Sequence, residues 1–428
     1  MMDESLVGME CHATSLPGIG GKLKSAPEDF VVEELSIVPA PGGSLYTVAT
    51  VKVRNWEMNR LVRELSRALR ISRRKITFAG TKDKRAITTQ IIQFQAPLEA
   101  VQAIRMPDVE ITNAYGTNRK IDLGDLAGNK FTVVLRKLDC PDEEAKARIA
   151  GIATELEKLG GFPNFFGVQR FGALRPVTHL VGKLIVQGDF EKAVMTYLGN
   201  PAEGEEPEAF AARKALEETH DFGAALHSYP RNMAFELAIL NHLAQNPGDY
   251  VGAIMTLPKN LQMMFVHAYQ SYLFNKMLCE RMRRGLPINV PVEGDVILPV
   301  NKDGLPDHER WIEAKADNQD TLRLRAKEGR AFVSAVLFGW ESVFANGEPG
   351  EIERGVVESE NLRHEMFMIP QIQRIGSKGS RRELVAPAKD LKWSVADGKA
   401  TFEFSLNRGC YATTLLREFM KKREMRDY

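Results

Sequence analysis

Cysteine is scarce in this sequence, and the few that occur lie far apart. They are Cys11, Cys140, Cys279 and Cys410, and no two of them form a CxxC pair. The spacing predicts neither a thiolate zinc site nor a disulfide framework, and it fits a reducing compartment such as the cytoplasm. The histidines are equally scattered, without HxH or HExxH spacing. We therefore expect no bound metal.

Long apolar runs are also missing. None approaches the roughly 18 residues that a membrane-spanning helix requires, so we expect no membrane association. Residues 1–16 contain acidic side chains but no basic segment, so we expect no secretory signal peptide. The sequence has no Walker A loop and no serine-hydrolase elbow, and "GIGG" at 18–21 is only a weak echo of a dinucleotide-binding loop.

The chain is long enough to form two or three domains. Its 428 residues are 44% hydrophobic and 26% charged, which is typical of a globular protein with a substantial core. Residues 45–53, 85–96 and 130–138 have strand composition, whereas residues 58–70 have helical periodicity. These patterns predict an α+β fold, with a mixed or antiparallel sheet and helices on one face.

The middle of the chain differs in composition from both ends. Residues 201–221 are acidic, and long amphipathic segments follow, while residues 399–424 return to a strand, a glycine turn and a helix. The Met- and aromatic-rich stripe in residues 261–284 favours a packed core helix over a binding groove. We expect a helix-rich domain, residues 173–385, inserted into an α+β domain formed by residues 1–172 and 386–428.

Acidic residues are nearly absent from residues 60–85. This stretch has ten Lys and Arg but only Glu64 and Asp83 as acids, in a chain whose net charge is +1. A dense patch of one sign is typical of a surface that follows a phosphate backbone, although a solvated helix face would also account for its first part. The candidate phosphate-binding residues are Arg60, Arg63, Arg67, Arg70, Arg73, Arg74, Lys82, Lys84 and Arg85.

Two further segments carry candidate chemistry. Asp83 in "GTKDK" is either a turn or N-cap residue or an ionised carboxylate, held among cations, that acts as a nucleophile or base. In "NFFGVQRFG" (164–172), an amide and two aromatic rings either bind unpaired bases or pack in the core. The residues alone leave both alternatives open.

Four motifs, in this order, resemble the TruD family of pseudouridine synthases. They are "GKLKSAPEDFVVEE" (21–34), "FAGTKDKRAITTQ" (78–90), "NFFGVQRFG" (164–172) and "GCYATTLLREFMK" (409–421). The resemblance spans the whole chain. The inserted region is longer than in typical bacterial members and resembles the archaeal and eukaryotic branch, and we expect an archaeal member. It implies the pseudouridine-synthase fold, a mixed, largely antiparallel sheet with flanking helices, together with a large inserted, helix-rich α/β domain.

The resemblance also implies roles for individual residues. Asp83 corresponds to the essential aspartate of the family, and Lys24 to its cationic partner. Asn164 and Phe166 correspond to residues that line the base pocket. Tyr411 stands where bacterial members tend to carry phenylalanine, so we expect its ring to stack on the base.

The activity implied is isomerisation of uridine to pseudouridine in tRNA, at uridine 13, in the cytoplasm. The reaction needs no cofactor or metal, and no obligate protein partner is evident. A non-catalytic RNA-binding or chaperone protein is the alternative, and it predicts salt-dependent tRNA binding without turnover. A metal-dependent nuclease is a third hypothesis, but the sequence offers no clustered ligands for its metal.

Overall fold

A computed structural model describes residues 3–427 of the chain, which divide into two compact units. The sheet unit comprises residues 14–162, 386–422 and 427, and the helical unit comprises residues 3–13, 163–385 and 423–426. The sequence pattern placed the first boundary at 172. Residues 163–172 belong to the helical unit, where the Phe166 N–H donates to Asn275 Oδ1 over 2.9 Å.

The sheet unit is built on one large mixed sheet, with strand order β14-β15-β7-β2-β5-β3-β6, in which β1 also pairs with β7 and β4 with β5. The strands are β1 (Gly20–Lys22), β2 (Phe30–Ser36), β3 (Tyr46–Arg54), β4 (Ile76–Phe78), β5 (Ile87–Phe94), β6 (Val109–Thr117), β7 (Leu126–Leu138), β14 (Ala388–Ala396) and β15 (Lys399–Asn407). Among its described strands, β2 and β5 pair in parallel and the other neighbours pair antiparallel. This largely antiparallel sheet agrees with the expectation from the sequence.

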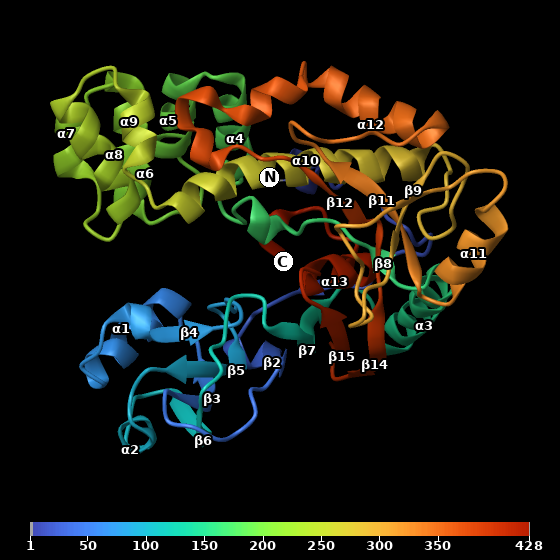
Figure 1. The fold of residues 1–428 in the computed structure, drawn as a ribbon, viewed down its shortest axis with the longest axis horizontal. Helices are drawn as coiled ribbons and strands as arrows, with labels where there is room; N and C mark the ends of the chain where they lie inside the picture. Colours follow the sequence, from blue (N-terminus) through green and yellow to red (C-terminus); the bar gives the residue numbers. More distant parts are fainter. Residues whose placement is uncertain (1–2, 428) are drawn as a thin grey trace. The chain divides into compact units, whose positions relative to one another are not determined.

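Helices cover this sheet (Figure 1). They pack on it through two separate clusters of buried apolar side chains. The helices are α1 (Met58–Ala68), α2 (Leu98–Gln102), α3 (Asp142–Leu159) and α13 (Ala412–Met420), with short 3₁₀ turns η2 (Pro27–Asp29) and η3 (Arg73–Lys75). α1 begins where the Glu57 carboxylate accepts the backbone N–H groups of Asn59 and Arg60, each over 2.8 Å. Its apolar stripe packs on β3 and β5, which leaves its arginines on the opposite side.

The helical unit combines many helices with a small antiparallel sheet of order β10-β9-β11-β12 (Figure 1). The helices are α4 (Thr178–Gln187), α5 (Phe190–Leu198), α6 (Pro207–Thr219), α7 (Phe222–Ser228), α8 (Ala234–Gln245), α9 (Tyr250–Met255), α10 (Lys259–Arg283), α11 (Gln319–Lys327) and α12 (Gly347–Ser359). The strands are β9 (Val296–Pro299), β10 (Ile312–Glu313), β11 (Ala331–Leu337) and β12 (Ser380–Glu383). The remaining elements are the strand pair β8 (Phe162–Pro163) and β13 (Val385–Ala386), and the 3₁₀ turns η1 (Glu4–Val7), η4 (Val168–Arg170), η5 (His364–Met368), η6 (Pro370–Ile375) and η7 (Met425–Asp427).

Helix α10 is the central helix of this unit. Val266, Tyr269, Leu273 and Met277 are all buried along it, so the prediction of a packed core helix rather than a groove is confirmed. Within residues 3–427, no helix combines the length and the apolar character that crossing a membrane requires.

Candidate active site

Lys24 and Asp83, 59 positions apart in the sequence, meet in the sheet unit. The Lys24 ammonium donates to Asp83 Oδ1 over 3.0 Å, and the two side chains are 14% and 39% exposed. Lys24 precedes β2 and Asp83 precedes β5, and the parallel pairing of these strands, with Val31 opposite Ile87, brings both loops to the same end. The carboxylate is therefore oriented by a cation and still open to a substrate.

Phe30 also contacts Lys24, through a cation–π interaction. The Lys24 Nζ lies 4.3 Å from the centroid of the Phe30 ring, which is buried at the start of β2. Lys24 itself has a φ of +51°, in the left-handed region that a non-glycine residue rarely adopts. A cation–π contact and an ion pair together fix the position of the ammonium group.

Lys82 does not join the basic surface that the charge pattern predicted for it. Its Nζ lies 2.5 Å from Glu34 Oε2, and the two side chains are only 7% and 0% exposed. Ser36 Oγ donates to the other carboxylate oxygen over 2.7 Å. Since both charges are buried and paired, Lys82 anchors the loop that carries Asp83 rather than contacting phosphate.

Glu34 and Phe30 are site residues that the sequence reasoning did not single out. Both belong to "PEDFVVEE", and both occupy the same face of β2 because side chains alternate along a strand. The alternation of side chains along this strand, which begins shortly after Lys24, would have indicated both residues.

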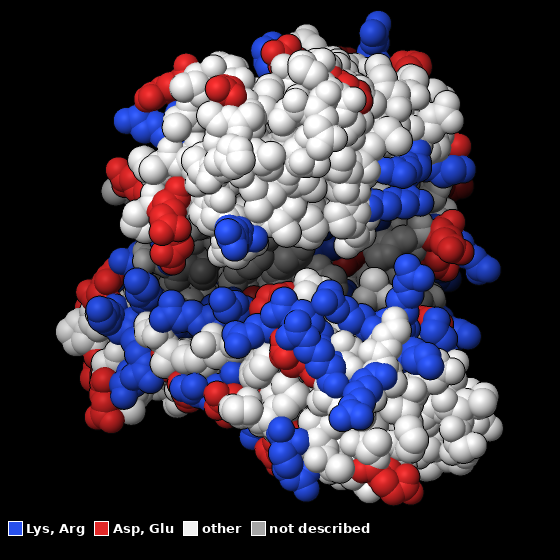
Figure 2. Space-filling view, turned by 90° about the vertical axis from the view of Figure 1, so that its left-hand side faces the viewer, with Lys and Arg blue, Asp and Glu red and all other residues white. Residues whose placement is uncertain are grey.

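The remaining basic residues lie on the surface around α1 and the following turn. Figure 2 shows Lys and Arg side chains gathered densely over this unit. Arg63 and Arg67 share Glu64, at 3.1 and 3.0 Å, and Arg85 donates to the Ser25 carbonyl over 2.8 Å. Among the residues that the structure describes, no carboxylate pairs with the side chains of Arg60, Arg70, Arg73, Arg74, Lys84 or Arg85.

An aromatic ring, that of Trp56, lies beside one of these cations. The Arg60 guanidinium lies 4.9 Å from the centroid of the Trp56 ring. Both residues, with Arg67, line a pocket of about 650 Å³ at the surface of the sheet unit. A cation without a carboxylate partner among the described residues, such as Arg60, beside an aromatic side chain provides the contacts that a nucleic-acid backbone and its bases use.

Tyr411 belongs to the same unit as Asp83. It is the N-cap residue of α13 in an extended conformation, with φ −106° and ψ 122°, and its carbonyl accepts from Thr414 Oγ1 over 2.8 Å. β15 ends at Asn407, which lies opposite Gly128 of β7. The glycine turn between Asn407 and Tyr411 therefore follows the edge of the sheet at which β15 and β2 end, since Gly128 also lies opposite Leu35 of β2.

Asn164 and Phe166 belong to the helical unit. The Asn164 amide is fully buried and already bonded at both ends: Oδ1 accepts from Arg382 Nη2 over 2.6 Å, and Nδ2 donates to Glu383 Oε1 over 2.9 Å. The Arg382 guanidinium lies 4.2 Å from the centroid of the Phe166 ring. In this structure Asn164 therefore orients Arg382 over Phe166.

Glu383 connects this network to His308, whose Nε2 lies 2.9 Å from Glu383 Oε2. Burial alone would raise the pKa of Glu383, but the hydrogen bond with His308 and the charges of Arg382 and His308 outweigh it and lower the pKa. Glu383 therefore stays ionised and keeps accepting from Asn164.

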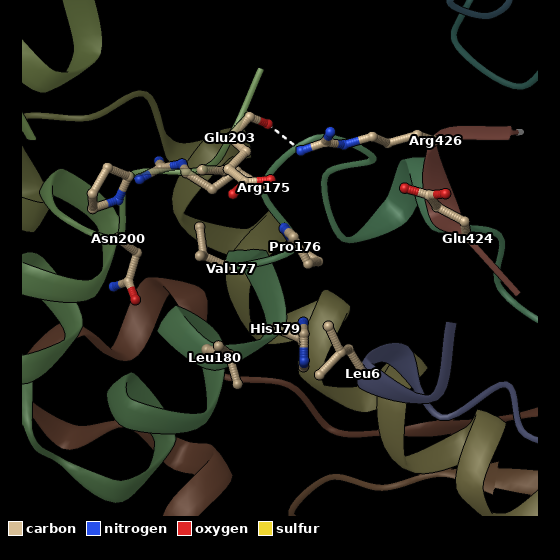
Figure 3. Close-up of a pocket in the computed structure, with 12 residues that line it drawn as sticks. Leu6, Arg175, Pro176, Val177, His179, Leu180, Asn200, Glu203, Glu424 and Arg426 are labelled. Atoms are coloured by element: carbon tan, nitrogen blue, oxygen red, sulfur yellow. Dashed lines mark hydrogen bonds between the residues drawn. The ribbon is translucent and has the colours of Figure 1, made fainter. Parts of the chain in front are cut away.

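A further pocket, of about 420 Å³, lies in the helical unit (Figure 3). Arg175, His179 and Arg426 contribute to its lining, and Arg426 donates to the Glu203 carbonyl. Burial lowers the pKa of His179 to about 4, so its ring is neutral at neutral pH. None of the site residues predicted from the sequence lines this pocket.

Metal ligands do not gather in the described part of the chain. Within residues 3–427, no group of three or more His, Cys, Asp or Glu side chains could hold a metal ion. The expectation that the reaction needs no metal or other cofactor stays a prediction.

Known proteins resemble this chain over nearly its full length. The family model described as "tRNA pseudouridine synthase D (TruD)" matches residues 6–419. The chain is 42% identical over 426 residues to the "Probable tRNA pseudouridine synthase D" of Methanococcoides burtonii, covering 98% of this chain and 97% of that protein. The relative of the same name from Methanosarcina mazei is 40% identical over 425 residues, with 98% and 97% covered.

A solved structure shows the same fold. The crystal structure of the putative TruD from Methanosarcina mazei matches with a TM-score of 0.84 and 40% identity, covering 99% of each chain. The fold and the full-length match to these relatives thus define a pseudouridine synthase. This chain belongs to the TruD family of tRNA pseudouridine synthases. The predicted α+β class, and the resemblance to archaeal members of the family, are confirmed.

Proposed function

We propose that this chain isomerises uridine to pseudouridine in tRNA, at uridine 13, with Asp83 as the reactive carboxylate. Membership of the TruD family supports the reaction and the tRNA substrate. The observation that carries the assignment of Asp83 is its ion pair with Lys24 at 3.0 Å, in which 39% of the aspartate side chain stays exposed. We further propose that the chain acts in the cytoplasm and without a protein partner.

The reaction breaks the N1–C1′ bond, turns the base and forms a C5–C1′ bond. The proton at C5 leaves and N1 gains one, so the reaction is balanced without an oxidant or a leaving group. Asp83 attacks the sugar, attacks the base, or removes a sugar proton. Each route needs an ionised carboxylate within reach of the nucleotide, and Lys24 holds the carboxylate in one orientation for it.

The uridine must leave its stack before its base can turn. Tyr411, in the same unit as Asp83, provides an aromatic ring on which the extruded base stacks. Within the helical unit, the Phe166 ring with the Arg382 guanidinium over it is by itself an aromatic surface on which a base can stack. We assign Asn164 to holding Arg382 in place, because both ends of its amide are engaged.

The unpaired cations around α1 hold the tRNA backbone. Contacts between cations and phosphates supply most of the affinity and make it depend on salt. This surface would also serve a non-catalytic RNA-binding protein, so catalysis has to be tested separately from binding.

Release of tritium from C5 of uridine in tRNA transcripts tests the proposal. The purified chain alone should release label from a transcript with uridine at position 13 and none when this uridine is replaced by cytidine. Asp83→Asn should bind the transcript within about twofold of the wild type but release label at least about 10⁴-fold more slowly, since the reactive group itself is removed. Asp122→Asn, an exposed aspartate of the same unit, should behave as the wild type.

Each contrary outcome has a definite meaning. Full turnover by Asp83→Asn would exclude Asp83 as the reactive carboxylate. Salt-dependent binding without any release of label by the wild type would favour the RNA-binding alternative. Release of label from the transcript that lacks uridine 13 would support the isomerisation but show that the target is a different uridine.

A further inference from the structure

Asn129, on β7 of the sheet unit, carries a polar atom for which the protein provides no partner. Its Oδ1 is shielded from solvent, and within residues 3–427 nothing donates a hydrogen bond to it. A buried acceptor of this kind costs about 1–3 kcal/mol when it stays unsatisfied. Such an atom in an enzyme needs an explanation, and a bound substrate that supplies the donor is one.

The sheet ladders place Asn129 between the two segments that we assign to the reaction. On one side it lies opposite Glu34 of β2, whose carboxylate binds the ammonium of Lys82, the residue before Asp83. On the other side it lies opposite Leu406 of β15, the strand that leads to Tyr411. Directly opposed residues of antiparallel strands share a face and lie about 4.5–5.5 Å apart. Asn129 thus lies on the strand between the anchor of the Asp83 loop and the approach to Tyr411.

Uracil has an edge that complements an amide. Its N3–H is a donor, and the carbonyl oxygens O2 and O4 on either side are acceptors. An asparagine side chain offers an acceptor and a donor side by side, so it can accept from N3–H and donate to the neighbouring carbonyl. Asparagine binds the edge of adenine in DNA with the same pair of groups.

The turn of the base leaves this edge unchanged. A half-turn about the axis through N3 and C6 exchanges N1 with C5 and O2 with O4, while N3–H stays in place. A group that accepts from N3–H and donates to one flanking carbonyl finds the same pattern before and after the turn. Such a group can hold the base while the N1–C1′ bond is broken and the C5–C1′ bond has not yet formed.

We propose that the Asn129 amide binds the imide edge of the target uracil and holds it through the turn. Oδ1 accepts from N3–H, and Nδ2 donates first to one carbonyl oxygen and, after the turn, to the other. This inference rests on the proposed function, since it requires uracil to be the base that Asp83 acts on.

The test compares uridine with 3-methyluridine at the target position of a synthetic tRNA, using single-turnover release of tritium from C5. In 3-methyluridine a methyl group replaces the hydrogen on N3, so the wild type should react much more slowly with 3-methyluridine than with uridine. Asn129→Ala removes the acceptor and opens space, so the ratio of the two rates should fall by roughly tenfold or more. This ratio does not depend on how much of the variant is folded, because both rates come from the same protein.

The single-turnover rate with unmodified uridine provides a second, independent measure of the role of Asn129. Asn129→Leu, similar in size but without polar atoms, should lower the single-turnover rate roughly 10- to 100-fold, while tRNA affinity stays within about twofold because phosphate contacts dominate it. Thr132→Val removes a polar group from the opposite face of the same strand and should change neither the rate nor the ratio.

The outcomes separate this inference from the proposal on which it rests. Equal rate ratios in the wild type and Asn129→Ala would overturn the role of Asn129 and leave the synthase activity standing. Failure of the wild type to release label from unmodified uridine would overturn both.

Discussion

Buried arginines of the helical unit and exposed arginines around α1 of the sheet unit differ in whether a carboxylate pairs with them. In the helical unit, Arg281 is buried and forms two hydrogen bonds with the carboxylate of Asp295, at 2.6 and 2.8 Å, and the buried Arg213 contacts Glu205 and Glu236 at 3.2 and 3.0 Å. In the sheet unit, Arg70, Arg73 and Arg74 are exposed, and no described carboxylate pairs with them. These buried arginines of the helical unit therefore have carboxylate partners inside the protein, whereas the three exposed arginines of the sheet unit remain available for a ligand.

Solvation explains the difference. A buried cation loses its water and must find a carboxylate inside the protein, and such a pair contributes mainly when it stays intact. An exposed cation keeps its water at little cost, so it can exchange that water for a phosphate when tRNA binds. The same residue type thus stabilises the fold where it is buried and paired, and is available to a ligand where it is exposed and unpaired.

The largest effect should come from breaking a buried pair of the helical unit. Arg281→Met should lower the free energy of unfolding by about 3–5 kcal/mol, because the buried Asp295 carboxylate loses its cationic partner. Urea denaturation followed by circular dichroism measures this. The double variant Arg281→Met/Asp295→Leu should recover most of the loss, and Arg330→Met, which removes an exposed pair, should cost less than about 1 kcal/mol. If Arg281→Met and Arg330→Met lowered the free energy of unfolding equally, burial would not decide how much an arginine pair contributes.

The next effect concerns catalysis in the sheet unit. Lys24→Met should reduce single-turnover release of label roughly 10²- to 10³-fold, because Asp83 loses the cation that orients it. The free energy of unfolding should change much less than for Arg281→Met. Lys22→Met, an exposed lysine at the end of β1, is the matched control and should keep nearly full activity. If both variants lost activity to a similar extent, the ion pair between Lys24 and Asp83 would have no specific role in catalysis.

The exposed arginines should act on binding alone. The triple variant Arg70→Ala/Arg73→Ala/Arg74→Ala should weaken tRNA binding and reduce the slope of log K against log salt by about three, since three phosphate contacts are lost. Filter binding at several salt concentrations measures the slope. Removing three exposed cations that already have carboxylate partners, Lys315, Arg323 and Arg330, should leave the slope nearly unchanged. Equal slopes for the two triple variants would mean that pairing does not decide which cations bind tRNA.

The smallest effect is a pH dependence of stability in the sheet unit. Burial alone would raise the pKa of Asp29, but hydrogen bonds from Arg136 and from the Ala26 N–H outweigh it and lower the pKa. A carboxyl whose pKa is lower in the folded state stabilises the protein above its unfolded pKa of about 3.9. This stabilisation, about 1–2 kcal/mol, is lost as pH falls through the lower folded pKa.

Asp29→Asn isolates this contribution. The difference in the free energy of unfolding between wild type and variant should be constant from about pH 7 to 5 and shrink below about pH 4. Urea denaturation at a series of pH values measures it. A difference that stays the same down to about pH 2 would show that the Asp29 carboxylate does not stabilise the fold.

Local patterns predicted much of the sheet unit. The residues expected as strands at 45–53 and 85–96 form β3 and β5, and the expected helix at 58–70 is α1. Alternation and helical periodicity are properties of neighbouring residues, so the sequence contains them directly. The pairing of Lys24 with Asp83 came from the family motifs, because no local pattern connects residues 59 positions apart.

Burial was the property that the sequence could not supply. Lys82 lies in a stretch whose composition predicts phosphate binding, yet it is buried against Glu34, 48 positions away. Asn164 looked like a group that reads a base, yet Arg382 and Glu383, more than 200 positions away, occupy both ends of its amide. These outcomes depend on long-range packing, which fixes whether a charge or an amide is free to bind a ligand.

The parallel ladder between β2 and β5 has a consequence for how this enzyme can change over time. A parallel pair needs a crossover connection, and here that connection comprises β3, α1, η3 and β4, which contain most of the basic surface. Insertions or charge changes within the crossover can alter which RNA is bound, while the ladder keeps Lys24 beside Asp83. Substrate range and reaction chemistry can therefore evolve independently within one continuous segment of the chain.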